Sequence, residues 1–194
     1  MIIIVSNPAP VKDEHNIIRQ LLMEGLTIFH LRKKALSESE MRKFIEKIAE
    51  EHYSKIILHS HYHLVVEYGL KGIHVPFSFS DDVQKVPLSV SFHSTEEINQ
   101  FKLPFVYGFL SPIFDSISKE GYRSTFDLNQ VKQFLTHRKD DIMALGGIDE
   151  DRLETLKELG FSGIVLHGAI WQNEYPVEKF KRIKEKWLKQ TSVY

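Results

Sequence analysis

The sequence contains no cysteine among its 194 residues. This absence excludes disulfide bonds, thiolate zinc sites, iron–sulfur clusters and a cysteine nucleophile. An excess of charge of either sign is also missing, because 25 lysines and arginines face 26 aspartates and glutamates, for a net charge of −1. A protein that holds nucleic acid through bulk positive charge is therefore not expected.

Long apolar runs are missing too. The N-terminal run of residues 1–5 is far shorter than a membrane-spanning helix, and no basic residues precede it as they would in a signal peptide. Hydrophobic residues make up 42% of the chain and charged residues 26%, which is typical of a folded globular protein. No linker rich in Gly, Ser or Pro divides the chain. These observations predict a cytoplasmic protein without membrane contacts, folded as a single domain over residues 1–194.

What the sequence does contain is a repeated unit, a short apolar run followed by a helical pattern. The alternation of buried strands with helices predicts a parallel α/β fold. Eight such units favour a closed (β/α)8 TIM barrel over an open doubly wound sheet, and no G-x-G-x-x-G turn follows the first run. The segment after Val75 is short and rich in serine, so we expect one degenerate helix after the fourth strand. The predicted strands are residues 1–5, 27–31, 55–58, 72–75, 88–92, 105–110, 142–145 and 163–167.

Active sites of such barrels lie at the carboxyl ends of the strands, so polar residues at these ends are the candidates. After the second predicted strand, His30, Arg32 and Lys34 alternate onto one face. Two cations at a strand end, in a nearly neutral protein, indicate an anionic ligand such as phosphate or pyrophosphate. The alternative is that Arg32, Lys33 and Lys34 only begin a solvated loop.

The fifth predicted strand also carries polar residues at inward positions, namely Ser89, Ser91 and His93. Inward polar side chains destabilise a barrel core unless they meet a ligand or one another. The pattern therefore indicates either a binding surface or an internal hydrogen-bond network.

The loop of residues 110–122 follows the sixth predicted strand and carries Ser116, Ser118 and Lys119. Hydroxyls, backbone N–H groups and one lysine suit a cradle for diphosphate. The same composition is also common in ordinary surface loops, and that alternative stays open.

Glycines follow the last two predicted strands, at Gly146, Gly147 and Gly168. In barrels the loops after the seventh and eighth strands often bind phosphate, because glycine lets backbone amides approach the oxygens. Tight turns also require glycine on steric grounds alone, so this signal has two interpretations.

Together these segments resemble the thiamine-phosphate synthase family, including its thiazole tautomerase relatives. The resemblance extends over almost the whole chain, in order, and implies the same barrel. It implies a transferase that joins an aminopyrimidine methyl diphosphate to a thiazole phosphate and releases pyrophosphate. The implied partners are small phosphorylated heterocycles, and the implied assembly is a homodimer. The segments that carry the resemblance are residues 29–34, 69–75, 90–94, 111–119, 144–148 and 163–170.

The resemblance also implies roles for individual residues. Lys119, Ser91 and Arg32 would be catalytic: the two cations hold the diphosphate, and Ser91 lies near the pyrimidine and the departing group. Ser116 and Ser118 stand where the family has two threonines, and they keep the hydroxyls. The implied substrate-binding residues are His30, Lys34, His59, Ser116, Ser118, Gly147, His167 and Gly168.

The resemblance implies Mg2+ as cofactor, and here the sequence departs from the family. The family's Asn-Asp pair after the third strand falls on His59 and Ser60, and its next metal-binding acid falls near Ser78. Both usual carboxylates are therefore missing. Three alternatives stay open: Mg2+ held by the diphosphate with Asp81 or Asp82, another metal held by histidines, or no metal at all.

The histidines lead to a rival interpretation, a histidine–metal hydrolase on the same barrel. His59, His61 and His63 alternate and can form an imidazole metal site with histidines at other strand ends, although His61 and His63 can also simply begin a helix. Non-synthase relatives, either a thiazole phosphate isomerase or a protein that binds thiamine intermediates, are the other rival. Pro112 stands where the tautomerase relatives carry their catalytic histidine, which disfavours the isomerase. The histidines at other strand ends are His30, His74, His93 and His167.

Overall fold

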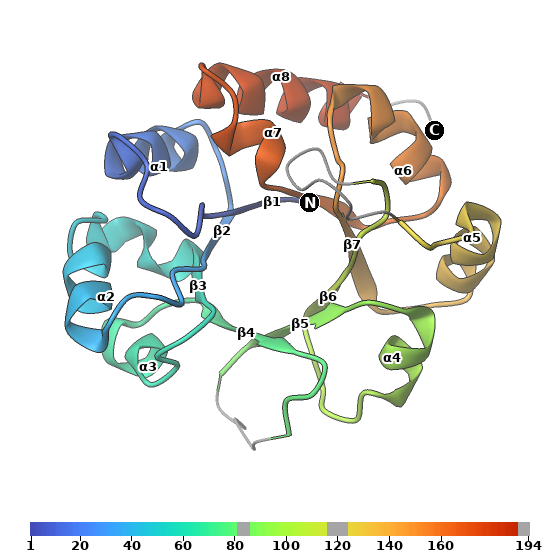
Figure 1. The fold of residues 1–194 in the computed structure, drawn as a ribbon, viewed down its shortest axis with the longest axis horizontal. Coiled ribbons are helices and arrows are strands. Elements are labelled where there is room, and N and C mark those ends of the chain that lie inside the picture. Colours follow the sequence, from blue (N-terminus) through green and yellow to red (C-terminus); the bar gives the residue numbers. More distant parts are fainter. Residues whose placement is uncertain (81–85, 116–123, 190–194) are drawn as a thin grey trace.

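The computed structural model describes residues 1–80, 86–115 and 124–189. Eight parallel strands follow one another in chain order around a closed barrel, and the last strand pairs with the first. Figure 1 shows the helices as an outer ring around it. The predicted TIM barrel is confirmed. The strands are β1 (Ile2–Val5), β2 (Ile28–Leu31), β3 (Ile56–Leu58), β4 (Gly72–Pro76), β5 (Leu88–Phe92), β6 (Tyr107–Leu110), β7 (Asp141–Leu145) and β8 (Gly163–Leu166). The helices are α1 (Glu14–Met23), α2 (Glu38–Ile45), α3 (Leu64–Tyr68), α4 (Thr95–Gln100), α5 (Leu128–Thr136), α6 (Leu153–Glu158), α7 (Gly168–Trp171) and α8 (Pro176–Lys189), with 3-10 turns η1 (Glu50–Lys55) and η2 (Glu150–Arg152).

The connection from β4 to β5 is the degenerate one, as the serine-rich sequence predicts. Its described residues, 77–80 and 86–87, contain no helix, whereas each other connection between successive strands carries at least one. The whole barrel fits within 194 residues, against about 250 for a typical barrel. Little chain is therefore left outside the βα units, and the loops at the strand ends must supply any binding site.

The helices begin where local chemistry favours it. At the start of α2 the Ser37 hydroxyl accepts from the Glu40 N–H, and the Glu40 carboxylate accepts from the Ser37 N–H, which together form a capping box. The last helix, α8, begins at Pro176, whose fixed φ suits a first helical turn. No helix in the described ranges has both the length and the apolar character needed to cross a bilayer.

Alternation along the strands divides the core into two parts. Outward side chains such as Ile4, Phe29 and Leu31 pack against the helices. A second, smaller cluster fills the barrel interior. The interior cluster consists of Ile3, Val5, Ile28, Ile57, Tyr107, Phe109, Met143 and Val165.

Candidate active site

A cavity of about 440 Å3 lies at the carboxyl ends of the strands. This volume suits a small-molecule ligand, and the position is the one that barrel enzymes use. Most of the site residues predicted within the described ranges reach its wall. They are Arg32, Lys34, His59, Ser91, Gly147, His167 and Gly168.

Five predicted residues cannot be placed. Ser116, Ser118 and Lys119 of the loop after β6 lie outside the described residues, and so do the metal candidates Asp81 and Asp82 after β4. Their roles stay predictions.

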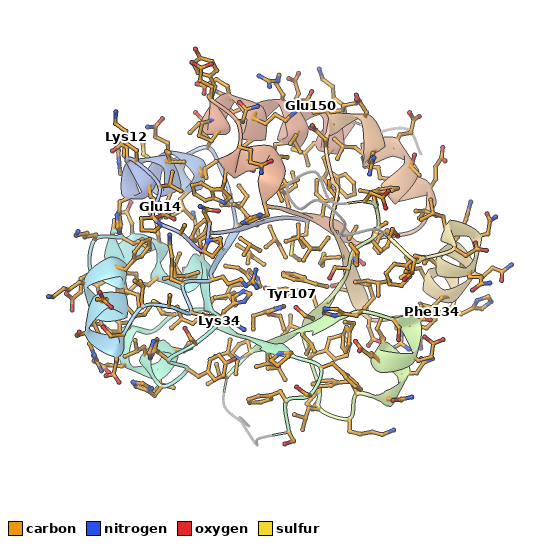
Figure 2. The ribbon with its side chains drawn as sticks, viewed as in Figure 1. Lys12, Glu14, Lys34, Tyr107, Phe134 and Glu150 are labelled. Carbon is orange, nitrogen blue, oxygen red and sulfur yellow. The ribbon has the colours of Figure 1, made fainter. Side chains whose placement is uncertain are left out.

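Two cations line the cavity at the end of β2. Arg32 and Lys34 are both exposed, and Figure 2 shows Lys34 on the barrel side of the ribbon. The backbone N–H of Arg32 donates to the Ser6 hydroxyl at 2.8 Å, and this bond connects the end of β2 to the end of β1. Within the described ranges neither side chain forms an ion pair. Both charges are therefore available to an anionic ligand.

Lys33, between these two cations, has a different environment. Only 3% of it is exposed, and its Nζ atom donates to Glu14 at 2.7 Å and to the Ala9 carbonyl at 3.0 Å. The alternative that residues 32–34 form a solvated loop is therefore wrong for Lys33. Successive side chains point to opposite faces, so the Lys33 side chain points away from the barrel interior and forms a buried ion pair with Glu14 of α1.

His74 of β4 stands between two serines of β5. The Ser89 hydroxyl donates to the Ile73 carbonyl at 3.1 Å, so its oxygen is left to accept from His74 Nδ1 at 2.9 Å. The Nε2 atom of His74 then carries no proton and accepts from the Ser91 hydroxyl at 2.6 Å. For Ser89 the predicted internal network is confirmed, whereas Ser91 joins the network and also lines the cavity.

Below the cavity, His30 and His59 form a second network. His30 Nδ1 lies 2.9 Å from His59 Nε2, and His30 Nε2 lies 2.7 Å from the Tyr107 hydroxyl. His30 is fully buried and does not line the cavity, while His59 does and stacks on His74 with ring centroids 4.4 Å apart. A role for His30 in substrate binding would therefore have to act through His59.

Burial keeps the three imidazoles neutral. It is the main cause that lowers the pKa of His74 to about 3, with the charges of Arg32 and Lys34 adding to it. Burial, followed by the neighbouring imidazoles, also holds the pKa of His30 and of His59 well below the usual range. At neutral pH the cavity floor is therefore uncharged and weakly basic.

The glycines after β7 are required by the close approach of the chain after β6. Gly146 and Gly147 have φ values of +102° and +62°. A Cβ atom on Gly147 would lie 2.3 Å from the Asp115 carbonyl oxygen, and one on Gly146 would lie 2.8 Å from Pro112. The steric interpretation is therefore confirmed, and since both glycines also line the cavity, the binding interpretation stays a prediction.

Three of the remaining histidines lie apart from the imidazole cluster. His61 adopts φ +52° and contacts the Leu36 carbonyl at 2.9 Å, and His63 precedes α3 and lies 3.3 Å from Glu38. The helix-start interpretation is confirmed for His63, which caps α3, whereas His61 lies before the helix. His93 lines the cavity but is exposed.

The sequence and the fold match a known family. A family model described as "Thiamine monophosphate synthase" matches residues 1–170. The chain belongs to this family. It is 27% identical over 188 residues to the thiamine-phosphate synthase of Anoxybacillus flavithermus, covering 90% of this chain and 87% of that protein. It is 22% identical over 190 residues to the thiamine-phosphate synthase of Oceanobacillus iheyensis, covering 89% and 90%.

Solved structures agree with this membership in the thiamine monophosphate synthase family. A thiamine phosphate pyrophosphorylase from Bacteroides thetaiotaomicron superposes with a TM-score of 0.83 and 30% identity, covering 100% of this chain and 99% of that one. A thiamine phosphate pyrophosphorylase from Pyrococcus furiosus has a TM-score of 0.81 at 16% identity, covering 97% and 95%, and shows the shared fold alone. The resemblance of the sequence to a transferase family of thiamine biosynthesis is thus confirmed.

The Mg2+ that this family generally uses does not fit the residues that can be placed. Mg2+ requires oxygen ligands, above all carboxylates. None of the described residues that line the cavity carries a carboxylate, and His59 and Ser60 stand where the resemblance places the family's Asn-Asp pair. The side chains that crowd the floor are imidazoles, which suit transition metals instead.

Proposed function

We propose that this protein is a thiamine-phosphate synthase, which joins an aminopyrimidine methyl diphosphate to a thiazole phosphate. The observation that carries the proposal is a shared cavity. Arg32 and Lys34, without ion pairs in the described ranges, line it together with the glycine turns at Gly147 and Gly168. A substrate pair with two phosphorylated ends matches a site with two separate anion-binding elements.

The reaction makes a specific demand on the protein. The C–O bond between the pyrimidine methylene and the diphosphate breaks, and its electron pair leaves with pyrophosphate. The lone pair of the thiazole nitrogen then forms the new C–N bond at the methylene carbon. No proton transfer is needed, so catalysis consists of supporting the leaving charge and positioning the two rings. Arg32 and Lys34 support the charge on the departing pyrophosphate. The neutral, weakly basic floor of the cavity agrees with a role in positioning the two rings rather than in proton transfer.

Ser91 is suited to hold the pyrimidine. Its hydroxyl proton points to His74 Nε2, so the oxygen offers only lone pairs to the cavity. An oxygen of this kind accepts from the amino group of an aminopyrimidine. Ser91 thereby orients the ring whose methylene carbon reacts.

Other parts of the proposal rest on the family resemblance. Ser116, Ser118 and Lys119 complete the diphosphate cradle, while Gly147 and the turn at His167 and Gly168 hold the thiazole phosphate. The protein acts in the cytoplasm as a homodimer on small phosphorylated heterocycles. The isomerase alternative is not favoured, because Pro112 lines the cavity without a group that transfers protons.

Incubation of the purified chain with both substrates tests the proposal. Parallel reactions contain either Mg2+ or EDTA, and thiamine phosphate and pyrophosphate are quantified by mass spectrometry and a phosphate-release assay. Appearance of both products supports the synthase activity. Absence of thiamine phosphate under both conditions overturns it.

A further inference from the structure

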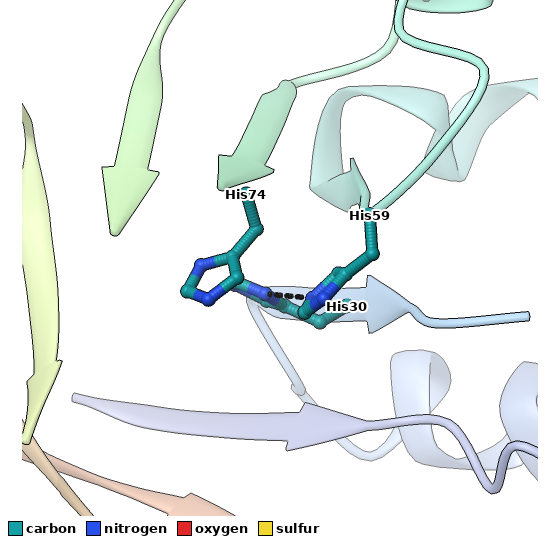
Figure 3. Close-up of side chains that lie close together, drawn as sticks. All are labelled: His30, His59 and His74. Atoms are coloured by element: carbon teal, nitrogen blue, oxygen red, sulfur yellow. Dashed lines mark hydrogen bonds between the residues drawn. The ribbon is translucent and has the colours of Figure 1, made fainter. Parts of the chain in front are cut away.

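Three histidines of adjacent strands converge beneath the cavity. The rings of His30 in β2, His59 directly after β3 and His74 in β4 lie close together in Figure 3. One ring nitrogen from each lies within 4.8 Å of the others. Elsewhere in the described ranges no group of three potential metal-binding side chains comes as close together. The arrangement therefore needs an explanation of its own.

The outer nitrogens of two of these rings are held by neutral partners. His30 Nε2 contacts the Tyr107 hydroxyl, and His74 Nδ1 contacts Ser89. Metal-binding histidines usually have such a second partner, which fixes the tautomer and aims the other nitrogen at the ion. The nitrogens left to turn toward an ion are His30 Nδ1, which lies 2.9 Å from His59 Nε2, and His74 Nε2, which contacts the Ser91 hydroxyl at 2.6 Å in this structure.

We propose that His30, His59 and His74 form a binding site for a divalent transition-metal ion of the zinc class. The fourth position faces the cavity, because His59 and His74 both line it. Three imidazoles with one open position form a recurrent arrangement for zinc in enzymes. The site does not depend on the proposed synthase activity.

The charge balance indicates what the fourth ligand is. Three neutral ligands leave the ion with its full double charge, and Arg32 and Lys34 line the same cavity as His59 and His74. A cation beside two cations requires an anion. Hydroxide or a phosphate oxygen in the cavity meets this requirement.

Binding requires some contraction of the cluster. Nitrogens around a tetrahedral zinc ion, at about 2.0–2.1 Å from it, lie roughly 3.3 Å apart. The His30–His59 pair is already closer than this, at 2.9 Å, and the other separations reach 4.8 Å at most. Rotation of the His74 ring away from Ser91 would bring its nitrogen toward the other two, so the hydrogen bond between Ser91 and His74 belongs to the metal-free protein.

Metal titration of the full chain, prepared without a polyhistidine tag and stripped with EDTA, tests the proposal. We expect about one equivalent of Zn2+ per chain by elemental analysis, and Co2+ should give the visible absorption of a four-coordinate site. His59→Gln and His74→Gln should each weaken Zn2+ binding at least about 100-fold. His137→Gln, at the exposed end of α5, is the matched control and should bind as the wild type does.

The outcomes are decisive in both directions. Wild-type protein that retains less than about 0.1 equivalents of Zn2+ at a slight metal excess overturns the proposal, as does unchanged binding in the His59 and His74 variants. If either variant fails to fold, X-ray absorption of the Zn2+-loaded wild type replaces it. Three imidazole nitrogens in the first coordination shell support the site, and fewer than three contradict it. None of these measurements uses the synthase substrates, so failure of the metal site and failure of the proposed function are distinguishable.

Discussion

The Nε2 atom of His74 lies 2.6 Å from the hydroxyl oxygen of Ser91, at the floor of the cavity. The Ser89 hydroxyl donates to the Ile73 carbonyl and therefore accepts from Nδ1 of the same ring. Because Nδ1 carries the proton, Nε2 carries none, and Ser91 is the donor in its bond to His74. A buried histidine of β4 thus sets the hydrogen-bonding character of a serine on β5 that a ligand can touch. The cavity therefore presents a hydrogen-bond acceptor at this point, and His74, with its pKa of about 3, is a weak base for the Ser91 hydroxyl.

Ser91→Ala removes that acceptor. We expect kcat/KM for the pyrimidine diphosphate to fall about 10- to 100-fold, since one hydrogen bond to the reacting ring contributes roughly 1–3 kcal/mol. Steady-state kinetics at saturating thiazole phosphate measures this. Ser54→Ala, on an exposed turn, serves as the control and should leave kcat/KM unchanged. Equal values for Ser91→Ala and the wild type would show that Ser91 does not contact the pyrimidine.

Arg32→Gln removes one of the two cations at the end of β2. Hydrogen bonds to a charged group contribute about 1.5–3 kcal/mol, so we expect kcat/KM to fall about 10- to 100-fold. The inhibition constant of inorganic pyrophosphate should rise by a similar factor. Arg19→Gln, exposed on α1, is the control. If inhibition by pyrophosphate is the same in both variants, Arg32 does not bind the diphosphate.

Gly147→Ala tests the close approach of the chain after β6. The new Cβ atom would collide with the Asp115 carbonyl, in addition to the strain of a positive φ. Gly69 has a similar φ of +64° and open space around it, so Gly69→Ala carries the strain alone, about 1–2 kcal/mol. Gly147→Ala should cost a further ~1–3 kcal/mol in the free energy of unfolding and also weaken binding of thiazole phosphate. Denaturant unfolding of both variants measures the difference, and equal losses would contradict the predicted collision.

The buried histidines make the stability of the metal-free protein depend on pH. The folded-state pKa of His74 is about 3, below the value of about 6.5 in an unfolded chain. The unfolded state therefore binds more protons between these values, so the stabilisation is complete above about pH 6.5 and is lost as the pH falls toward 3. Each such histidine contributes a slope of up to about 1.4 kcal/mol per pH unit.

Denaturant unfolding in EDTA between pH 7 and pH 4 measures this slope. The slope should be shallower in His74→Gln, which folds without a titratable ring at this position, and unchanged in His137→Gln. A slope that does not change in His74→Gln would show that His74 titrates normally.

The barrel could be predicted because strands buried on both sides give continuous apolar runs, separated by helical patterns. Alternation within those runs also placed Phe29 and Leu31 against the helices and Ser89 and Ser91 in the interior. Both results depend only on residues close together in the sequence. The single domain over residues 1–194 and the homodimer stay predictions.

The partners of buried polar groups could not be predicted in the same way. Tyr107 lies in an apolar run, and its hydroxyl meets His30, 77 residues away in the sequence. Lys33 looks solvated between two other cations, but Glu14, brought close by α1, pairs with it. Only the register between Ser89 and Tyr107 on neighbouring strands could have indicated that this tyrosine faces inward.

A simultaneous time course of the two products tests the central claim most directly. One reaction contains the pyrimidine diphosphate and thiazole phosphate, and a second omits the thiazole phosphate. The proposed reaction predicts that thiamine phosphate and pyrophosphate appear at equal rates in the first, and that neither appears in the second. Release of pyrophosphate without thiamine phosphate would instead indicate a hydrolase, and absence of both products would contradict the synthase activity.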